Sequence, residues 1–195
     1  MQTIKTPFEK ERALQILEKA FHQSPGIIWM IGEKQKKIKS FLSMFLMEAS
    51  VNDGAYLTSD NNGVVLFFQL QHQRSSLLLT LKKIYVLLFI MGLTRGLQAI
   101  KYKKMIDEIR PKQGWFGWLV ATDSSVVGNV AAYEIKNFMF QSSDDSQEPV
   151  FVETTVPRVR TLYQKAGYIE YASMKHPWQN LDIWFFKREP NLIKK

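Results

Sequence analysis

The order of apolar segments after Gly114 limits the fold more than any other feature of the chain. Runs of strand length at 115–122, 150–155, 168–174 and 181–187 are separated by helical patterns at 128–140 and 157–166 and by a polar loop at 142–148. Gly167 suits the C′ position that ends the second of these helices. Strands that alternate with helices form a sheet with helices packed on it. We therefore predict an α+β fold in α/β/α layers, built on a mixed central sheet of about six to seven strands.

The first part of the chain has helical patterns. Thr6-Pro7-Phe8-Glu9 is typical of a capping box with proline at the first helical position, and the helix it opens should end before Ser24-Pro25-Gly26. A second helix is predicted at 33–50, because its apolar residues repeat at spacings of three and four. Two more are predicted at 75–91 and 94–109, separated by Gly92 and ended by Pro111.

Between these helices the apolar period changes. Residues 55–59 and 64–70 are short apolar or β-branched runs on either side of Asp60-Asn61-Asn62-Gly63. They predict a hairpin in which Gly63 and the asparagines supply positive φ angles at the turn. The complete order of elements, ααββααβαβαββ, contains no linker, so we expect residues 1–195 to form a single domain.

The composition excludes several classes of site. The chain has no cysteine, which excludes disulfides, thiolate nucleophiles and cysteine-ligated metals, and His22, His72 and His176 are too scattered to predict a metal site. The first residues lack the apolar stretch of a secretory signal, and the longest apolar run, 84–93, is too short to span a bilayer. We therefore expect a soluble, cytoplasmic protein that does not act on membranes.

The chain is basic, with 26 Lys and Arg against 18 Asp and Glu and a formal net charge of +8. This charge is dispersed along the sequence. It could attract nucleic acid, an anionic membrane or an anionic cofactor, but solvated helix faces explain most of it, and no nucleic-acid motif accompanies it. A nucleic-acid partner is therefore the weakest of the readings that we consider.

A strand followed by a short loop and a helix often binds phosphate, because the first N–H groups of the helix have no backbone partner and the helix dipole favours anions. The segment that follows the predicted strand at 115–122 has this form, and the small residues around Gly128 leave room for a ligand. The candidate cofactor-binding residues are Ala121, Thr122, Val127, Gly128, Asn129, Val130, Ala131 and Ala132. By spacing alone this signal is weak.

Four segments of the second half carry a family resemblance. They are WFGWLVATD (115–123) for an aromatic central strand, PVFVETT (149–155) for P-x-x-L-E-T-S, LYQKAGY (162–168) for L-Y-x-K-x-G-F, and WFFKR (184–188) for W-x-M-x-R. The chain thus resembles the GCN5-related N-acetyltransferase (GNAT) superfamily, and within it the puromycin N-acetyltransferase-like group. The earlier helices and hairpin also suit that group, so the resemblance extends over nearly the whole chain.

The resemblance implies a GNAT-like acyl-CoA N-acyltransferase fold and transfer of an acetyl group from acetyl-CoA to a small amine. It places Tyr163 where the family has the acid that protonates the departing thiolate, although Tyr163 could simply pack a helix on the sheet. An oxyanion would be stabilised by strand amides near Ala121. Glu153 is the candidate base or amine contact, because a carboxylate among apolar residues needs a reason; the simpler alternative is that it faces solvent or pairs with Lys or Arg.

The loop departs from the family pattern Q/R-x-x-G-x-G/A. Neither possible register supplies the leading Gln or Arg, and Val130 stands where the fuller pattern has its middle glycine. The alternative function is therefore a GNAT-like binding or regulatory domain without catalysis. Glu48 and Asp53 could line the acceptor side but read more simply as surface residues, and the aromatic residues Trp115, Trp118, Phe67 and Phe68 read most simply as core.

Overall fold

The computed structural model describes residues 1–32, 35–126 and 130–191. Its strands are β1 (Gln2–Thr3), β2 (Ala55–Leu57), β3 (Gly63–Gln69), β4 (Trp115–Thr122), β5 (Val150–Thr154), β6 (Ile169–Lys175) and β7 (Asp182–Arg188). Its longer helices are α1 (Pro7–Phe21), α2 (Pro25–Ile31), α3 (Ile38–Val51), α4 (Leu77–Tyr85), α5 (Leu93–Ile109), α6 (Val130–Ser146) and α7 (Pro157–Lys165). Short helical segments are η1 (Gln35–Lys37), η2 (Leu70–His72) and the π-helix η3 (Val86–Met91), which continues α4.

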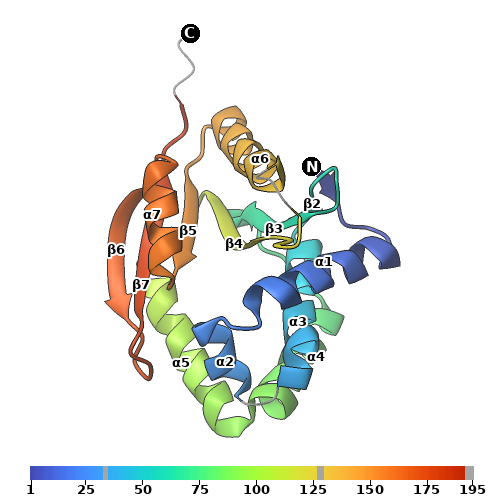
Figure 1. The fold of residues 1–195 in the computed structure, drawn as a ribbon. Coiled ribbons are helices and arrows are strands. Elements are labelled where there is room, and N and C mark those ends of the chain that lie inside the picture. Colours follow the sequence, from blue (N-terminus) through green and yellow to red (C-terminus); the bar gives the residue numbers. More distant parts are fainter. Residues whose placement is uncertain (33–34, 127–129, 192–195) are drawn as a thin grey trace.

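The strands form one seven-stranded sheet in the order β1-β2-β3-β4-β5-β7-β6 (Figure 1). Neighbouring strands are antiparallel except for β4 and β5, which are parallel. The predicted mixed sheet is therefore confirmed. The parallel pair of β4 and β5 lies in the interior of the sheet, between β3 and β7.

Helices cover both faces of the sheet, as the α/β/α prediction requires. The α1 face is covered by α1, α2, α3 and η3, whose buried side chains pack on Leu66, Phe116 and Phe151. The α6 face is covered by α6 and α7, which pack on Phe67, Val152 and Phe186. Helix α5 packs through Ile106 on Phe185, at the end of the sheet nearest β6 and β7. Figure 1 shows α5 and α2 below these strands and α6 above the opposite face.

Two local sequence signals are confirmed at atomic level. Thr6 and Glu9 form the capping box, with the Glu9 N–H donating to Thr6 Oγ1 at 3.2 Å and the Thr6 N–H donating to Glu9 Oε2 at 2.8 Å. Gly167 ends α7 with φ +91°, and the Tyr168 N–H donates to the Tyr163 carbonyl at 3.0 Å. Only glycine adopts this backbone region without strain, so the chain turns directly from α7 into β6.

The hairpin of β2 and β3 is confirmed, but its turn chemistry differs from the prediction. Asn61 has a positive φ of 55°, whereas Gly63 already lies in β3. A Cβ at Gly63 would lie 2.8 Å from Thr58 Cγ2 and 3.1 Å from Ala131 Cβ. Glycine is therefore needed there because the start of α6 packs closely on the strand.

Several predicted boundaries were wrong. The chain forms α2 where Ser24-Pro25-Gly26 predicted only a break, because Pro25 occupies the first position of a new helix. The predicted polar loop at 142–148 is helical as far as Ser146, since the hydroxyls of Ser142 and Ser146 bond to carbonyls four residues earlier. The predicted second helix starts at Ile38 after η1, and its expected first residues, 33 and 34, lie outside the described residues. Strand β1 was not predicted.

Within the described ranges, none of the helices has both the length and the apolar character that crossing a bilayer requires.

Candidate active site

The parallel strands β4 and β5 separate part of the way along their length. They pair at only three positions, Trp115 with Val150, Phe116 with Phe151 and Gly117 with Val152. Beyond these positions β4 continues with β3 as far as Thr122, and β5 continues with β7 as far as Thr154. The two strands thus form a fork, with 118–122 on one arm and Glu153 and Thr154 on the other. Backbone groups along both inner edges have no partner strand across the fork.

A β-bulge at Trp118 marks the start of the fork. Opposite β3, Phe67 pairs with Gly117 and Leu66 pairs with Leu119, so Trp118 is an additional residue in β4. The side chains of Trp118 and Leu119 therefore both pack on the α1 face, although successive residues of a regular strand alternate. A bulge bends its strand and strengthens the local twist, which contributes to the separation of β4 from β5.

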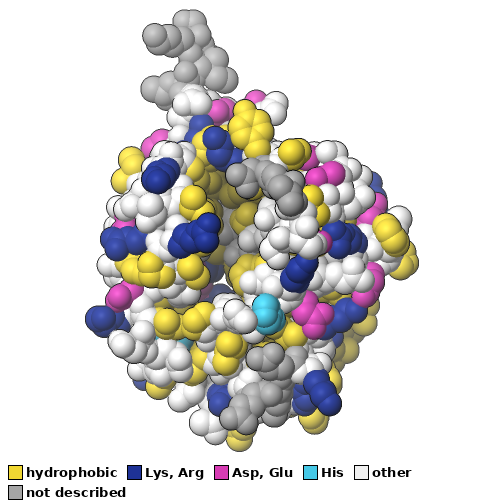
Figure 2. Space-filling view, in the orientation of Figure 1, with side chains coloured by type: hydrophobic (Ala, Val, Ile, Leu, Met, Phe, Trp, Pro, Cys, Tyr) yellow, Lys and Arg dark blue, Asp and Glu magenta, His cyan; other side chains and the backbone are white. Residues whose placement is uncertain are grey.

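The molecular surface is hollowed along this fork. Figure 2 shows a hollow in the face of the molecule that also faces the viewer in Figure 1, with apolar side chains inside it and Lys or Arg side chains beside it. The fork opens toward the segment that joins β4 to α6. An extended, anionic molecule suits this combination of apolar surface, free backbone groups and positive charge.

The described members of the predicted cofactor-binding set lie at the open end of the fork. Ala121 is buried in the α1-face core, and Thr122 is exposed at the end of β4. Val130 begins α6 and is 71% exposed, Ala131 is buried against the sheet, and Ala132 is exposed. Val127, Gly128 and Asn129 lie outside the described residues. The described members thus lie at the end of β4 and at the start of α6.

Asp123 is the first residue after β4, and hydrogen bonds hold its side chain in place. Its carboxylate accepts hydrogen bonds from Lys19 Nζ at 2.8 Å, Arg12 Nη2 at 3.0 Å and the Ser125 N–H at 3.0 Å. Arg12 also donates through Nε to the Asn61 carbonyl at 2.9 Å. The Lys19 and Ser125 hydrogen bonds, with that of Arg12, hold the pKa of Asp123 well below its ordinary value. One cluster therefore ties α1, the hairpin turn and the loop that leads to α6.

Tyr163 lies on the α6 face of the sheet. Its half-buried ring packs 5.3 Å from the Tyr168 ring and 5.6 Å from the Phe186 ring. It belongs to the cluster that contains Val152, the last residue of β5 that pairs with β4, and Val120 of the other arm. Burial raises the pKa of Tyr163 to about 12. Its hydroxyl makes no hydrogen bond to another described residue, so it remains available as a donor.

Glu153 points to the opposite face and pairs with Arg110. The guanidinium donates from Nε to Glu153 Oε1 at 2.8 Å and from Nη2 to Oε2 at 3.0 Å, and both side chains are 17% exposed. Arg110 also lies over the Phe116 ring, 4.2 Å from its centroid. Both carboxylate oxygens of Glu153 are thus engaged, which is the pairing alternative that the sequence left open.

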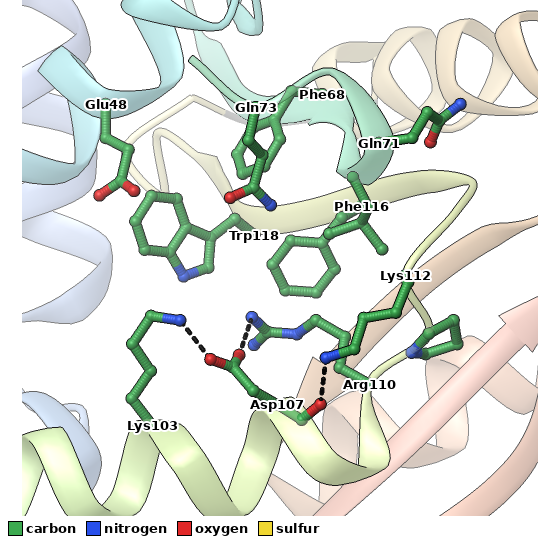
Figure 3. A pocket seen from close by; sticks show the side chains of 12 residues that line it. Glu48, Phe68, Gln71, Gln73, Lys103, Asp107, Arg110, Lys112, Phe116 and Trp118 are labelled. Carbon is green, nitrogen blue, oxygen red and sulfur yellow. Dashed lines mark hydrogen bonds and ion pairs between the residues drawn. The ribbon is translucent and has the colours of Figure 1, made fainter. Parts of the chain in front are cut away.

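A cavity of about 310 Å³ lies on the α1 face next to the bulge. Its lining includes the aromatic rings of Phe68, Phe116 and Trp118 (Figure 3). Charged side chains occupy its other sides. Asp107 pairs with Lys103 and lies 3.6 Å from Arg110, and Lys112 donates to the Asp107 backbone carbonyl at 2.6 Å.

Glu48 also lines this cavity, and its carboxylate points toward the space beside Trp118 in Figure 3. Lys83 Nζ binds Glu48 Oε1 at 2.7 Å, while Oε2 has no partner among the described residues. Asp53 instead pairs with Arg74 on the surface, where its side chain is 74% exposed. The structure therefore brings one of the two acidic residues to the site and leaves the other outside it.

The sequence reasoning missed Arg110, the bulge at Trp118 and the cavity. Arg110 follows α5 and precedes Pro111, a position that carries no motif. The bulge becomes visible only from the register of β4 against β3. For Trp118 and Phe68, the aromatic character of the strands was the available signal, and it is equally typical of a core.

Neither a protein-family model nor a curated protein sequence matches the chain. Solved structures do. A histone acetyltransferase-related acetyltransferase from Corynebacterium glutamicum superposes with a TM-score of 0.66 at 17% identity, covering 98% of this chain and 96% of that one. A mosquito arylalkylamine N-acetyltransferase-like protein gives 0.61 at 12% identity, with coverage of 95% and 97%.

A polyamine N-acetyltransferase from Drosophila melanogaster, which forms N-acetylagmatine, gives a TM-score of 0.60 at 11% identity, with coverage of 93% of this chain and 95% of that one. These likenesses extend over nearly the whole chain. At such low identity they define the fold and leave the substrate open. The seven-stranded mixed sheet with its flanking helices is the GNAT acyl-CoA N-acyltransferase fold.

Proposed function

We propose that this protein transfers an acetyl group from acetyl-CoA to a small amine in the fork between β4 and β5. The observation that carries the proposal is the separation of two parallel strands after three paired positions, beside a bulge and ahead of a helix N-terminus. Such a fork presents free backbone groups on both sides of an extended ligand. The names of the structural neighbours, which acetylate amines, support the same reaction class.

The residues at the open end of the fork suit the coenzyme. Helix α6 begins at Val130, and the first N–H groups of a helix attract phosphate because they lack helical carbonyl partners. Val130 and Tyr133 are 71% and 63% exposed and offer apolar contact beside them. In the proposal Val127, Gly128 and Asn129 complete this binding loop. The coenzyme would supply a thioester whose carbonyl carbon accepts the amine.

The proposed reaction forms a C–N bond and breaks the C–S bond. Strand amides near Ala121 stabilise the negative oxygen that develops on the carbonyl. Tyr163 donates a proton to the departing thiolate. Its hydroxyl is protonated at neutral pH, as that of any tyrosine with a pKa of 10 or above is, and burial raises the pKa of Tyr163 to about 12. The position of Tyr163 on the α6 face, beside Val152 and Val120, supports this role.

We place the acceptor amine in the cavity on the α1 face. Aromatic rings attract an ammonium group, and the free oxygen of Glu48 can accept its hydrogen bond. An amine has an ordinary pKa near 10, so it must lose a proton before it attacks. Glu48 is better placed than Glu153 to begin this proton transfer, because Arg110 engages both oxygens of Glu153.

Calorimetric titration with acetyl-CoA tests the proposal directly. We expect micromolar affinity for the wild type and release of free thiol when an amine is added. Thr122→Glu places a negative charge at the end of β4 and should weaken coenzyme binding by about tenfold or more, since like charges repel in the site. Thr94→Glu, an exposed substitution on α5, is the matched control and should bind normally.

The second candidate function is a GNAT-like binding or regulatory domain. The loop departures favour it, because a leading Gln or Arg is missing and Val130 replaces a glycine. Absence of binding heat at high acetyl-CoA concentration, with a folded protein, would support this candidate and contradict the enzyme. Binding without thiol release for any amine in a broad panel would do the same.

Three wider expectations also stand as proposals. We propose that residues 1–195 act as one domain, which the continuous seven-stranded sheet supports. The likeness of the four sequence segments supports a place near the puromycin N-acetyltransferase-like group. A cytoplasmic location agrees with the sequence reasoning and with a coenzyme of intracellular metabolism.

A further inference from the structure

The helices between β3 and β4 expose an unusual amount of apolar surface. Ten large apolar side chains of α4, η3 and α5 are between 44% and 74% exposed. We call them the α4–α5 surface; they are Leu77, Leu78, Leu81, Ile84, Tyr85, Leu88, Phe89, Leu93, Leu97 and Ile100. Single exposed apolar residues are ordinary, but a contiguous group on a monomer marks an interaction site.

The spacing of these residues places them on continuous stripes. Leu77, Leu81, Ile84 and Leu88 follow one another at intervals of four and three, which is one side of a helix. The opposite side of the same helix already packs on the core through Leu79, Val86 and Ile90. The outer stripe is therefore additional to what the core requires.

The stripe continues around a fixed corner. Gly92, with φ +81°, turns the chain from η3 into α5, where Leu93, Leu97 and Ile100 continue it. At Gly96 a Cβ would lie 3.0 Å from the Leu87 carbonyl oxygen, so α5 packs tightly on η3. In Figure 1 this corner forms the lower end of the molecule, opposite α6.

The segment of sequence that carries the α4–α5 surface has charges of one sign. No acidic residue occurs between Asp60 and Asp107, whereas Lys and Arg occur seven times there. Four of these cations, Lys82, Arg95, Lys101 and Lys104, have no carboxylate partner among the described residues. Lys37 adds a fifth cation, because its Nζ donates to the Phe89 carbonyl at 2.8 Å.

We propose that the α4–α5 surface docks on an anionic lipid bilayer. The apolar side chains would enter the boundary between headgroups and acyl chains, and the surrounding cations would bind lipid phosphates and carboxylates. Charge complementarity favours this occupant over a second copy of the chain. A symmetric dimer would press the surface against itself and bring its unpaired cations together. The proposal replaces the expectation from the sequence that the protein has no membrane partner, and it is independent of the acetyltransferase function.

Co-sedimentation of the full chain with lipid vesicles tests the proposal. We expect binding to vesicles of phosphatidylcholine with phosphatidylserine, little binding to phosphatidylcholine alone, and weaker binding as salt screens the charges. Phe89→Ser/Leu93→Ser should lower the bound fraction by about tenfold. Phe8→Ser/Ile169→Ser, which changes exposed apolar residues elsewhere, should leave it unchanged.

A second pair of variants separates local charge from net charge. Lys101→Gln/Lys104→Gln should reduce binding to the anionic vesicles by about tenfold. Lys10→Gln/Lys165→Gln removes the same charge from exposed positions outside the surface and should not. All four lysines are exposed, so we expect both charge variants to fold. Their comparison therefore tests the proposal even if Phe89→Ser/Leu93→Ser unfolds.

Equal losses in both charge variants would overturn the proposal, because binding would then follow net charge alone. Failure of the wild type to bind anionic vesicles at low salt would also overturn it. Light scattering tests the other occupant, a second copy of the chain. If the wild type is a dimer that does not bind vesicles, and Phe89→Ser/Leu93→Ser makes it monomeric, the surface is a dimer interface.

Discussion

At the scale of single residues, Arg110 is the side chain on which the base of the fork depends. It follows α5, stacks on Phe116 of β4 and holds Glu153 of β5 by two hydrogen bonds. Burial by itself would lower the pKa of Arg110, but the Glu153 carboxylate, with smaller contributions from Asp107 and Tyr171, raises it above its ordinary value. Arg110 thus joins the two strands on the α1 face at the point where their own pairing ends.

Glu153→Gln should lower the free energy of unfolding by about 2–4 kcal/mol, since it leaves the largely buried Arg110 with only the Asp107 carboxylate, 3.6 Å away, as a counter-charge. Urea unfolding at neutral pH measures the change. Glu170→Gln is the control. The Arg160–Glu170 pair is more exposed than the Arg110–Glu153 pair, so this change should cost less than about 1 kcal/mol. A Glu153→Gln protein that keeps its stability but loses turnover would instead identify Glu153 as the base.

Tyr163→Phe should lower turnover by about 10²-fold and leave the affinity for acetyl-CoA nearly unchanged, because it removes a proton donor and keeps the ring packing. Steady-state kinetics and calorimetry give the two quantities. Tyr168→Phe alters a neighbouring ring of the same cluster and is the matched control. Equal turnover in wild type and Tyr163→Phe would remove Tyr163 as the acid.

At the scale of elements, strong local patterns were predictable and weak ones were not. The strands at the centre of the sheet are nearly continuous apolar runs, so their positions follow from the sequence. Helix α2 has only 7 residues, too few to show a period. Residues 142–146 read as a loop because serine competes for backbone hydrogen bonds, yet here the hydroxyls bond within the helix.

The candidate site was predictable in outline only. The loop between β4 and α6 and the tyrosine of α7 were found because each lies in a local motif. The Arg110–Glu153 pair joins residues 43 positions apart, and no local spacing relates them. The cavity likewise depends on how α3, α5 and β4 approach one another in space.

Gly117 is the last residue of β4 that pairs with β5, and close packing at this position excludes a larger side chain. A Cβ there would lie 2.7 Å from Met139 Cε and 3.0 Å from Val152 Cγ1, between α6 and β5. Gly117→Val should therefore lower the free energy of unfolding by about 1–3 kcal/mol through overpacking. Thermal and urea unfolding check this value. Gly26→Ala, where a Cβ meets nothing within 4 Å, should not destabilise the protein.

At the scale of the whole molecule, Asp123 links parts that are distant in sequence. Lys19 and Arg12 bring α1 to it, and Arg12 also holds the turn between β2 and β3. The loop that leads into α6 thus starts from a position fixed by two other elements. This cluster holds the end of the fork's arm that β4 forms.

The low pKa of Asp123 makes this link dependent on pH. A carboxylate whose pKa is lowered by folding stabilises the native state above its unfolded pKa and loses that contribution as the pH falls toward the folded value. Asp123→Asn should therefore cost about 1–2 kcal/mol at pH 7 and at pH 5, and less at pH 3, below the ordinary value of 3.8. Urea unfolding at the three pH values measures these differences.

Asp182→Asn is the control for this experiment, because its partner Lys175 is 78% exposed and the pair is screened by water. We expect a small effect of Asp182→Asn at every pH. A cost of Asp123→Asn that stays constant down to pH 3 would show that the hydrogen bonds act without the charge.

The short parallel pairing of β4 and β5 leaves two half-sheets that share a seam of three residue pairs. An extended ligand with its own amide groups could complete this seam as an eighth strand would, since its N–H and C=O groups can meet those of Trp118–Thr122 and of Glu153 and Thr154. Binding of the ligand should then slow deuterium uptake by the backbone amides on both sides of the seam at once. Backbone amide exchange rates would therefore report whether the site is occupied.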